Sequence, residues 1–359
     1  MKYFQLNPEC YLITGAHRSL IHNLLTGKIL WLDANNTKQI LLAEAGNEVN
    51  ENESTFTELE KLGWGFFSDS KYFVDKLRST NIYNETKIWK NSPNLFFATI
   101  QLNTECNSNC SFCNNIFCPI CIKNSYKTIM DKDMFFELIN GCIFYGLKEV
   151  LLTGGEPLLH PNICEICSYI EDRNISLSIK TNGLIKPINF PQDTKFIILL
   201  DNFNDFDKII SNYKGYKNVT ILTNKRNDNL ALPRLPERWA VQFFATNLII
   251  NKETMKGTTL DEFFLKKLNN PCLFSKLTVL SDGSVVPCLQ NKKQIIGNVK
   301  NDEFSQIIKK LSLDYWSKPI GERKFGKCKK CEFKYACNSC IFADCDKLCS
   351  YDVEAGQWK

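Results

Sequence analysis

The sequence lacks the features that would place the chain in a membrane or outside the cell. No uncharged apolar run approaches the roughly 18 residues of a membrane-spanning helix, and the first residues, MKYFQ, lack the apolar core of a signal peptide. The chain also lacks a strong excess of either charge, with 44 basic and 39 acidic side chains. Its net charge of +5 therefore does not argue for a nucleic-acid partner. We expect a cytoplasmic protein of two or three domains with neither a membrane nor a nucleic acid as partner.

Cysteine, by contrast, is abundant. A chain of the reducing cytoplasm cannot hold its 17 cysteines as a disulfide framework, so ligation of metal ions or iron–sulfur clusters becomes the leading explanation. The cysteines crowd into two groups, which predicts two separate sites. The groups are Cys106, Cys110, Cys113, Cys118 and Cys121 in one loop, and Cys328, Cys331, Cys337, Cys340, Cys345 and Cys349 near the C-terminus.

From about residue 95 to 250, short apolar runs alternate with amphipathic stretches of helical length. This pattern is typical of repeated βα units. Parallel strands with helical crossovers form an open sheet or a barrel, and in both cases chemistry gathers at the carboxyl ends of the strands. Six units favour a partial (β/α)6 barrel, a fold of the α/β class. The expected strands are 96–102, 149–153, 176–181, 196–200, 219–223 and 240–244, with helices such as 133–145 and 161–173 between them.

The residues on either side of this region have other patterns. Strands are expected over 11–14, 20–25 and 28–32, and helices over 37–45 and 55–62, which together predict a small α+β module. After about residue 251 the βα rhythm gives way to a segment rich in cysteine and lysine. We therefore expect three domains: an N-terminal module over 1–92, the barrel over 93–255 and a cysteine-rich domain over 256–359.

Three cysteines follow the first expected strand directly, spaced Cys106-x3-Cys110-x2-Cys113. A [4Fe–4S] cluster with four protein thiolates is coordinatively complete, whereas one with three keeps an iron open for a substrate or cofactor. Taken alone, the triplet is equally compatible with a zinc site or with buried thiols. A second motif decides between them, because the strand 149–153 runs into Thr153-Gly154-Gly155-Glu156-Pro157, where the glycines let the backbone approach a ligand closely.

Together the two motifs resemble those of the radical S-adenosylmethionine (SAM) superfamily. The resemblance implies a [4Fe–4S] cluster on the three cysteines, SAM bound to its open iron, and cleavage of SAM to a 5′-deoxyadenosyl radical. It also implies that Phe112 packs near the adenine and that the GGEP segment holds the methionyl end. An ordinary turn stays open for Thr181-Asn182-Gly183. The implied cofactor contacts are Phe112, Gly154, Gly155, Glu156, Pro157, Thr181 and Asn182.

The C-terminal cysteines resemble the SPASM extension, which carries two auxiliary [4Fe–4S] clusters in radical SAM enzymes that modify peptides and proteins. Cys349 is preferred to Cys345 because Cys349-Ser-Tyr351-Asp352 resembles the closing segment of that extension. Before Cys340 the gap is x2 rather than x3. With only three clear ligands, the first cluster has either an unrecognised fourth ligand or an open iron. A structural zinc site over 328–340 is the alternative. The implied ligands are Cys272, Cys288 and Cys340 for the first auxiliary cluster, and Cys328, Cys331, Cys337 and Cys349 for the second.

Three further segments resemble the grasp-with-spasm type of peptide maturase. They are Tyr3-Phe-Gln-Leu6, Gly15-Ala-His-Arg18-Ser19 and Cys331-Glu-Phe-Lys-Tyr-Ala-Cys337. The resemblance implies abstraction of hydrogen from a ribosomally made precursor peptide, followed by formation of a thioether or a carbon–carbon cross-link. It also implies a leader peptide gripped as an added strand by the N-terminal module, and a reducing partner such as flavodoxin or ferredoxin. A structural cap is the alternative for that module.

Two other functions remain open. An anaerobic sulfatase maturase would share the radical SAM motifs, but Leu289 stands where that family is expected to have an aspartate base after Cys288. A non-catalytic iron–sulfur protein, acting as a peptide-binding or electron-transfer partner, is the other possibility. The intact cysteine triplet and the GGEP segment favour an enzyme.

Overall fold

The computed structural model describes residues 2–79, 94–110, 113, 127–223, 235–243, 250–319, 326–337 and 349–359. Contacts divide the chain into two compact units. The first unit joins Met1–Ile88, Ile249–Cys272 and Ser317–Lys359, and the second joins Trp89–Leu248 and Leu273–Trp316. The expected boundaries after residues 92 and 255 stay a prediction. None of the described helices is long and apolar enough to cross a membrane.

The second unit is built on one sheet in the order β11-β10-β9-β8-β7-β6-β12-β13-β14. From β6 to β11 each strand lies beside its predecessor in the chain and runs parallel to it. A doubly wound sheet reverses its strand order, whereas this order continues in one direction, as in a barrel. The six parallel strands confirm the sequence prediction: β6 (Phe97–Asn103), β7 (Glu149–Gly154), β8 (Ser176–Thr181), β9 (Lys195–Leu199), β10 (Val219–Thr223) and β11 (Ala240–Phe243).

Three strands that sequence patterns did not indicate extend the sheet beyond β6. β12 (Lys276–Val279) pairs with β6 in parallel, and β13 (Ser284–Val286) and β14 (Gly297–Asn298) follow in antiparallel register. They come from the region after residue 251, where the βα rhythm has ended. The barrel sheet is therefore completed by residues more than 170 positions along the chain from β6.

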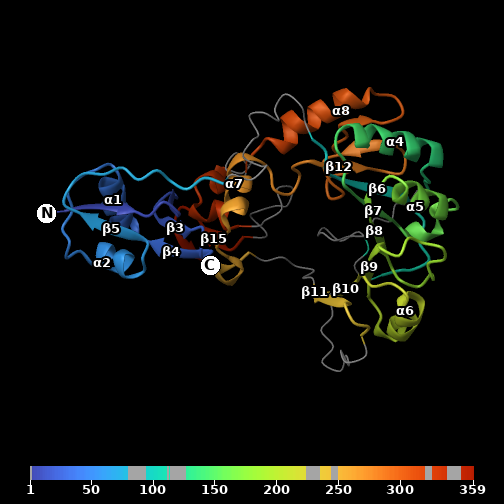
Figure 1. The fold of residues 1–359 in the computed structure, drawn as a ribbon, viewed down its shortest axis with the longest axis horizontal. Helices are drawn as coiled ribbons and strands as arrows, with labels where there is room; N and C mark the ends of the chain where they lie inside the picture. The colour runs from blue at the N-terminus through green and yellow to red at the C-terminus, as the bar shows by residue number, and fades with distance from the viewer. Residues whose placement is uncertain are drawn as a thin grey trace. The chain divides into compact units, whose positions relative to one another are not determined.

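Helices cover the outer side of the parallel strands (Figure 1). In α4 (Lys132–Phe144) the residues at 135, 138, 139 and 142 are buried, which is the i, i+3, i+4, i+7 stripe of an amphipathic helix. Its N-terminus is capped by Asp131, whose carboxylate accepts hydrogen bonds from the backbone N–H groups of Asp133 and Met134. The other helices of this unit are α5 (Ile163–Glu171), α6 (Phe206–Tyr213) and α8 (Phe304–Leu311), with short turns η2 (Pro157–Leu159), η3 (Phe203–Asp205) and η6 (Ser312–Trp316).

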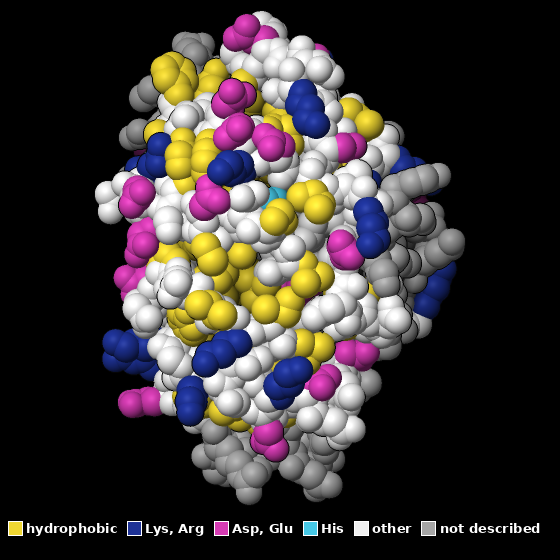
Figure 2. Space-filling model, turned by 90° about the vertical axis from the view of Figure 1, so that its right-hand side faces the viewer, with side chains coloured by type: hydrophobic (Ala, Val, Ile, Leu, Met, Phe, Trp, Pro, Cys, Tyr) yellow, Lys and Arg dark blue, Asp and Glu magenta, His cyan; other side chains and the backbone are white. Residues whose placement is uncertain are grey.

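The side chains on the face shown in Figure 2 are charged with both signs. Lysine and arginine side chains are scattered over this face among aspartate and glutamate side chains and groups of apolar ones. A phosphate backbone is recognised by clustered positive charge. On this face the basic side chains are interspersed with acidic ones.

The N-terminal part of the first unit holds two small sheets. β2 (Cys10–Thr14), β3 (Ser19–Asn23) and β4 (Lys28–Leu32) form an antiparallel meander, and β1 (Tyr3–Leu6) pairs with β5 (Gly65–Ser68). With α1 (Ala34–Glu44) and α2 (Ser54–Lys61), the meander confirms the predicted α+β module. The β1–β5 pair was not predicted, because each strand has only four residues and its partner lies about 60 residues away.

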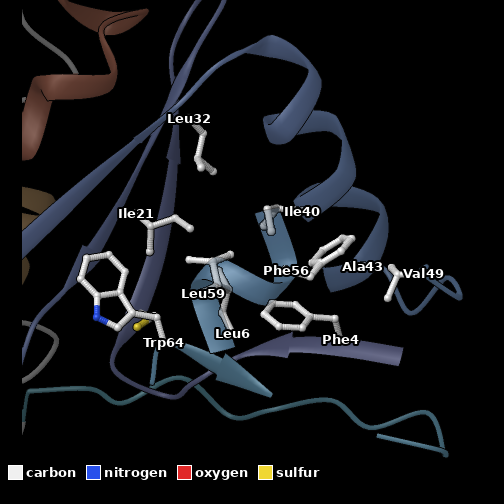
Figure 3. Close-up of a cluster of buried hydrophobic side chains, with 11 residues drawn as sticks. Phe4, Leu6, Ile21, Leu32, Ile40, Ala43, Val49, Phe56, Leu59 and Trp64 are labelled. Atoms are coloured by element: carbon white, nitrogen blue, oxygen red, sulfur yellow. The ribbon is translucent and has the colours of Figure 1, made fainter. Parts of the chain in front are cut away.

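A core of aromatic and aliphatic side chains holds this module together (Figure 3). Phe4 of β1 and Phe56 of α2 lie with their ring centroids 4.8 Å apart, and both are almost fully buried. Gly65 is required opposite them, because a Cβ there would lie 2.3 Å from the ring of Phe4. The core therefore spans both small sheets and both helices.

The C-terminal part of the first unit packs against this module. Helix α7 (Leu260–Leu268) begins with a capping box between Thr259 and Glu262, and its Phe263 ring lies 5.0 Å from that of Tyr11 in β2. The remaining elements are η5 (Lys252–Thr254), α9 (Gly326–Lys329), η8 (Glu332–Tyr335) and the hairpin of β15 (Tyr351–Asp352) and β16 (Gln357–Trp358).

Replacing Phe56 with alanine should lower the free energy of unfolding of the N-terminal module by about 3–5 kcal/mol, because the lost ring leaves a cavity in a packed core. Hydrogen exchange of the β1 and β5 amides measures this change. Leu62→Ala is the matched control, since Leu62 is 49% exposed and its truncation should change stability by less than about 0.5 kcal/mol. Equal effects of the two substitutions would contradict the assigned core.

Candidate active site

Cys106, Cys110 and Cys113 lie after the carboxyl end of β6. The backbone N–H of Cys113 donates to the carbonyl of Cys110 over 3.1 Å, and the two thiols are also hydrogen-bonded. Burial raises the pKa of Cys110 to about 12, and the neighbouring charges of Cys113, Asp201 and Cys106 raise it further. The three cysteines therefore lie close enough to repel one another as thiolates, an arrangement that binding to iron would stabilise.

Asn182, at the end of β8, ties this loop to the sheet. Its Nδ2 lies 2.6 Å from Asn107 Oδ1, 3.1 Å from Ser108 Oγ and 3.8 Å from Cys106 Sγ. Gly183 follows with a φ of +77°, which favours glycine and turns the chain away from the site. The Thr181-Asn182-Gly183 segment is thus a turn whose amide also anchors the cysteine loop.

Glu156 is the most buried acid of the site, with no exposed surface. Its carboxylate accepts hydrogen bonds from the N–H of Leu158 (3.0 Å), the N–H of Asn182 (2.8 Å) and the hydroxyl of Thr181 (2.8 and 2.9 Å). Burial raises its pKa to about 7 despite these donors. In this structure the carboxylate joins the ends of β7 and β8 and so positions Asn182.

The glycines of the same segment let two strand ends approach. A Cβ on Gly154 would lie 2.6 Å from the carbonyl oxygen of Asn103, and one on Gly155 would lie 2.2 Å from that of Glu105. The N–H groups of Gly155 and Glu156 donate to these same two carbonyls over 3.0 and 2.7 Å. The GGEP segment therefore fastens the start of the cysteine loop directly to β7.

A pocket of about 180 Å³ opens beside Cys110 at the carboxyl ends of β8 and β9. Its apolar wall comes from four aliphatic residues, and its polar wall includes Asp201, Asn202 and Asp205, which sequence reasoning missed. Their signal was present, because they follow directly after the fourth strand of the barrel. The lining residues are Ser108, Asn109, Cys110, Asn182, Leu184, Leu199, Leu200, Asp201, Asn202, Asp205 and Ile209.

The second cysteine group contains four thiols that influence one another. Burial raises the pKa of Cys331, and Cys337 and Cys328 raise it further. Burial likewise raises the pKa of Cys349, with further contributions from Cys337 and Cys328. These are the four ligands expected for the second auxiliary cluster.

Among the described residues, no three His, Cys, Asp or Glu side chains are grouped closely enough to hold a single metal ion. A four-iron cluster is larger than a single ion, so its thiolate ligands lie farther apart. Thiols that raise one another's pKa without enclosing a single ion fit the wider spacing of ligands around a cluster.

The ligand set expected for the first auxiliary cluster stays a prediction. Cys272 is exposed and belongs to the first unit, whereas Cys288 is half-buried and belongs to the second. Phe112 and Cys340 lie outside the described residues, as do Cys118, Cys121 and Cys345.

Two parts of the chain match known protein families. Residues 100–229 match the radical SAM superfamily, and residues 271–332 match the SPASM iron–sulfur cluster-binding domain. The chain belongs to the radical SAM enzymes that carry a SPASM domain. Its cofactors are SAM and iron–sulfur clusters.

Curated relatives share part of the chain. It is 33% identical to the GTP 3′,8-cyclase of Synechocystis over 87 residues, covering 24% of this chain and 26% of the cyclase. It is 28% identical over 87 residues to a probable GTP 3′,8-cyclase of Methanococcus maripaludis, covering 24% and 28%. It is 25% identical over 189 residues to the 7-carboxy-7-deazaguanine synthase of Clostridium acetobutylicum, covering 52% and 76%. The chain thus spans about a quarter of the length of these cyclases.

Two solved structures resemble this chain at low sequence identity. SuiB of Streptococcus suis bound to its precursor peptide SuiA is 14% identical, with 94% of each chain covered and a TM-score of 0.42. The structure of anSMEcpe with bound AdoMet and the Kp18Cys peptide is 16% identical, covering 68% of this chain and 88% of that chain, with a TM-score of 0.48.

The raised pKa of Glu156 should make the barrel less stable as pH rises. The folded protein keeps this proton up to about pH 7 and the unfolded chain only up to about pH 4.5. The unfolded state therefore binds fewer protons in that window, and stability falls by on the order of a few kcal/mol across it. Urea unfolding of cluster-free protein measures the loss. Glu156→Gln should remove it, whereas the exposed-site control Glu137→Gln should keep it; an unchanged loss in Glu156→Gln would refute the assignment.

Replacing Asn182 with alanine should loosen the cysteine loop, because two hydrogen bonds and a thiol contact are lost together. We expect the affinity of the loop for its cluster to fall about tenfold, measured as iron content and as the electron paramagnetic resonance (EPR) signal of the reduced cluster. Asn202→Ala is the control, since the Asn202 side chain accepts from the N–H of Asn204 within its own turn. Wild-type iron content in Asn182→Ala would show that the loop does not need this anchor.

Proposed function

We propose that this enzyme modifies a ribosomally synthesised precursor peptide whose leader is bound by the N-terminal module. The observation that supports a peptide substrate is the meander β2-β3-β4, in which β4 is an edge strand. Residues Ile29, Leu30 and Trp31 of β4 are partly exposed. An edge strand presents unpaired N–H and C=O groups to which an extended peptide can add as a further strand.

The opposite edge of the meander is less suited to this role. On the side of β2, the N–H of Leu77 donates to the carbonyl of Pro8 over 2.8 Å, and the hydroxyl of Tyr11 donates to the carbonyl of Leu77. The segment around residue 77 therefore runs beside β2. We infer that the leader adds to β4.

In the second unit, Cys106, Cys110 and Cys113 are the proposed ligands of the radical SAM cluster. SAM bound there supplies a 5′-deoxyadenosyl radical that abstracts hydrogen. The chain's own contribution is to hold the loop through Asn182 and Glu156. Leu184, Leu199, Leu200 and Ile209 give the pocket apolar lining, and its polar side chains suit the hydroxyl groups of a nucleoside.

In the first unit, Cys328, Cys331, Cys337 and Cys349 supply four thiolates, which complete the coordination of a [4Fe–4S] cluster and suit it to electron transfer. Such a cluster would accept the electron that a cross-linking reaction leaves on the product radical. The proposed products are a thioether or a carbon–carbon cross-link, each formed with loss of two hydrogen atoms. A flavodoxin or ferredoxin is the proposed electron donor to the radical SAM cluster.

The reaction is tested with anaerobically reconstituted, reduced enzyme, SAM and peptides encoded by small open reading frames beside its gene. We expect release of 5′-deoxyadenosine and a peptide that has lost two hydrogens by mass spectrometry. The variant with Cys106, Cys110 and Cys113 all changed to alanine is the control and should do neither. Absence of 5′-deoxyadenosine from the wild type would refute an active enzyme, and consumption of added GTP with unchanged peptides would refute the peptide substrate.

A further inference from the structure

Three segments that lie far apart in the sequence meet in the first unit. They are the turn containing Gly15 and Arg18, the segment that begins Cys331-Glu332-Phe333, and the closing hairpin from Tyr351 to Trp358. Each segment contains residues that resemble those of peptide maturases. In these segments, the proposed reaction uses only the cysteines. Their meeting point is a buried acid.

Glu332 is 1% exposed, and its carboxylate lies between the N-terminal module and the closing hairpin. Its Oε1 accepts a hydrogen bond from Trp31 Nε1 in β4 over 3.3 Å and another from the hydroxyl of Tyr351 in β15. Gly15 allows this approach, because a Cβ there would lie 2.4 Å from Glu332 Oε2 and 3.0 Å from its backbone nitrogen. One carboxylate thus joins strand β4 to both the turn and the hairpin.

Aromatic packing surrounds this carboxylate. The Phe333 ring lies 5.9 Å from Trp31, 4.9 Å from Tyr351 and 5.3 Å from Trp358, measured between ring centroids. The guanidinium of Arg18 lies 4.4 Å from the centroid of the Trp31 ring, a cation–π contact. Trp31 is therefore held from two sides, by Arg18 and by Glu332.

The same contacts adjoin the second cysteine group. Cys331 directly precedes Glu332, and Cys349 lies two residues before Tyr351. Both cysteines pack against the apolar cluster that contains Leu20 of β3. The two thiols therefore belong to the same packed cluster as residues of β3 and β4.

We propose that Glu332 is a positioning residue that couples cluster binding by Cys328, Cys331, Cys337 and Cys349 to the order of strands β3 and β4. Metal ligands fix the chain segments that carry them, so cluster binding is also folding energy. Burying the Glu332 carboxylate without its hydrogen-bond donors costs free energy. The carboxylate therefore favours the one arrangement in which Trp31 and Tyr351 both donate to it. One consequence rests on the proposed function. Only enzyme loaded with this cluster would hold a leader peptide firmly on β4.

The test measures hydrogen exchange of the β3 and β4 amides in the full-length chain. The background is Cys106→Ala, Cys110→Ala, Cys113→Ala, so that chelation and reconstitution change only the SPASM clusters. With Glu332 present, removal of the clusters should raise exchange about tenfold or more, and reconstitution should reverse this. With Glu332→Ala, exchange should be fast in both states.

Two further variants separate coupling from simple loss of structure. Glu332→Gln keeps an oxygen that can accept from Trp31 and Tyr351 and should restore most of the cluster dependence. Glu354→Gln removes an exposed carboxylate that pairs with Lys330 in the same segment and should behave as the parent chain. EPR of the reduced SPASM clusters confirms that each variant is loaded.

Equal exchange of β3 and β4 with and without clusters in the parent chain would overturn the proposal. So would a full cluster dependence that persists in Glu332→Ala. Neither readout needs a peptide, so the result stands apart from the proposed function. If the coupling holds but no leader peptide protects the β4 amides, the peptide assignment fails and the coupling remains.

Discussion

The site depends on one constraint: three thiols that repel one another when charged must be held together at the end of a single strand. Anchors for the described part of the loop come from the neighbouring strands. Asn182, directly after β8, reaches Cys106 and its neighbours, and the GGEP segment at the end of β7 lies in close contact with Asn103 and Glu105. All three strands end at the same edge because they run parallel, so the sheet itself sets the geometry of the loop.

A buried acid at this edge follows from the same geometry. Where parallel strands end, backbone N–H groups lose their partners in the sheet, and buried groups of this kind must be satisfied elsewhere. Glu156 accepts from the N–H groups of Leu158 and Asn182 and from the hydroxyl of Thr181. The cost of burying its charge appears as a raised pKa. In exchange, the carboxylate fixes the ends of β7 and β8 relative to each other, and these strand ends hold the cysteine loop.

Local pattern was enough to predict much of this fold. The six parallel strands and helices α4 and α5 follow from apolar runs and amphipathic periods, which depend only on neighbouring residues. Strands β1, β5 and β12 were missed because they are short and their partners lie far along the chain. The two units could not be read from the sequence either, since each is assembled from segments separated by other parts of the chain.

The candidate site was predictable in its residue types but not in their roles. Spacing singled out Cys106, Cys110, Cys113 and the GGEP segment. It could not show that the Glu156 carboxylate is engaged by Thr181 and Asn182, because the contact joins two strands through side chains. In the same way, Gly15 and Glu332 were noted as parts of separate motifs, and only the fold shows that they touch.

The two proposed ligand sets differ in their number of thiols, and the surroundings of the described cysteines differ as well. Three thiols leave a coordination position for a cofactor, and Cys110 accordingly lines a pocket at the carboxyl edge of the barrel sheet. Four thiols complete a cluster, which then needs no opening and can serve as part of a folded scaffold. Cys331 and Cys349 accordingly pack into the apolar cluster that also contains Leu20 and Trp31 of the N-terminal module. In the proposed enzyme, the incomplete cluster belongs to the unit that performs the chemistry and the complete one to the unit that holds the peptide.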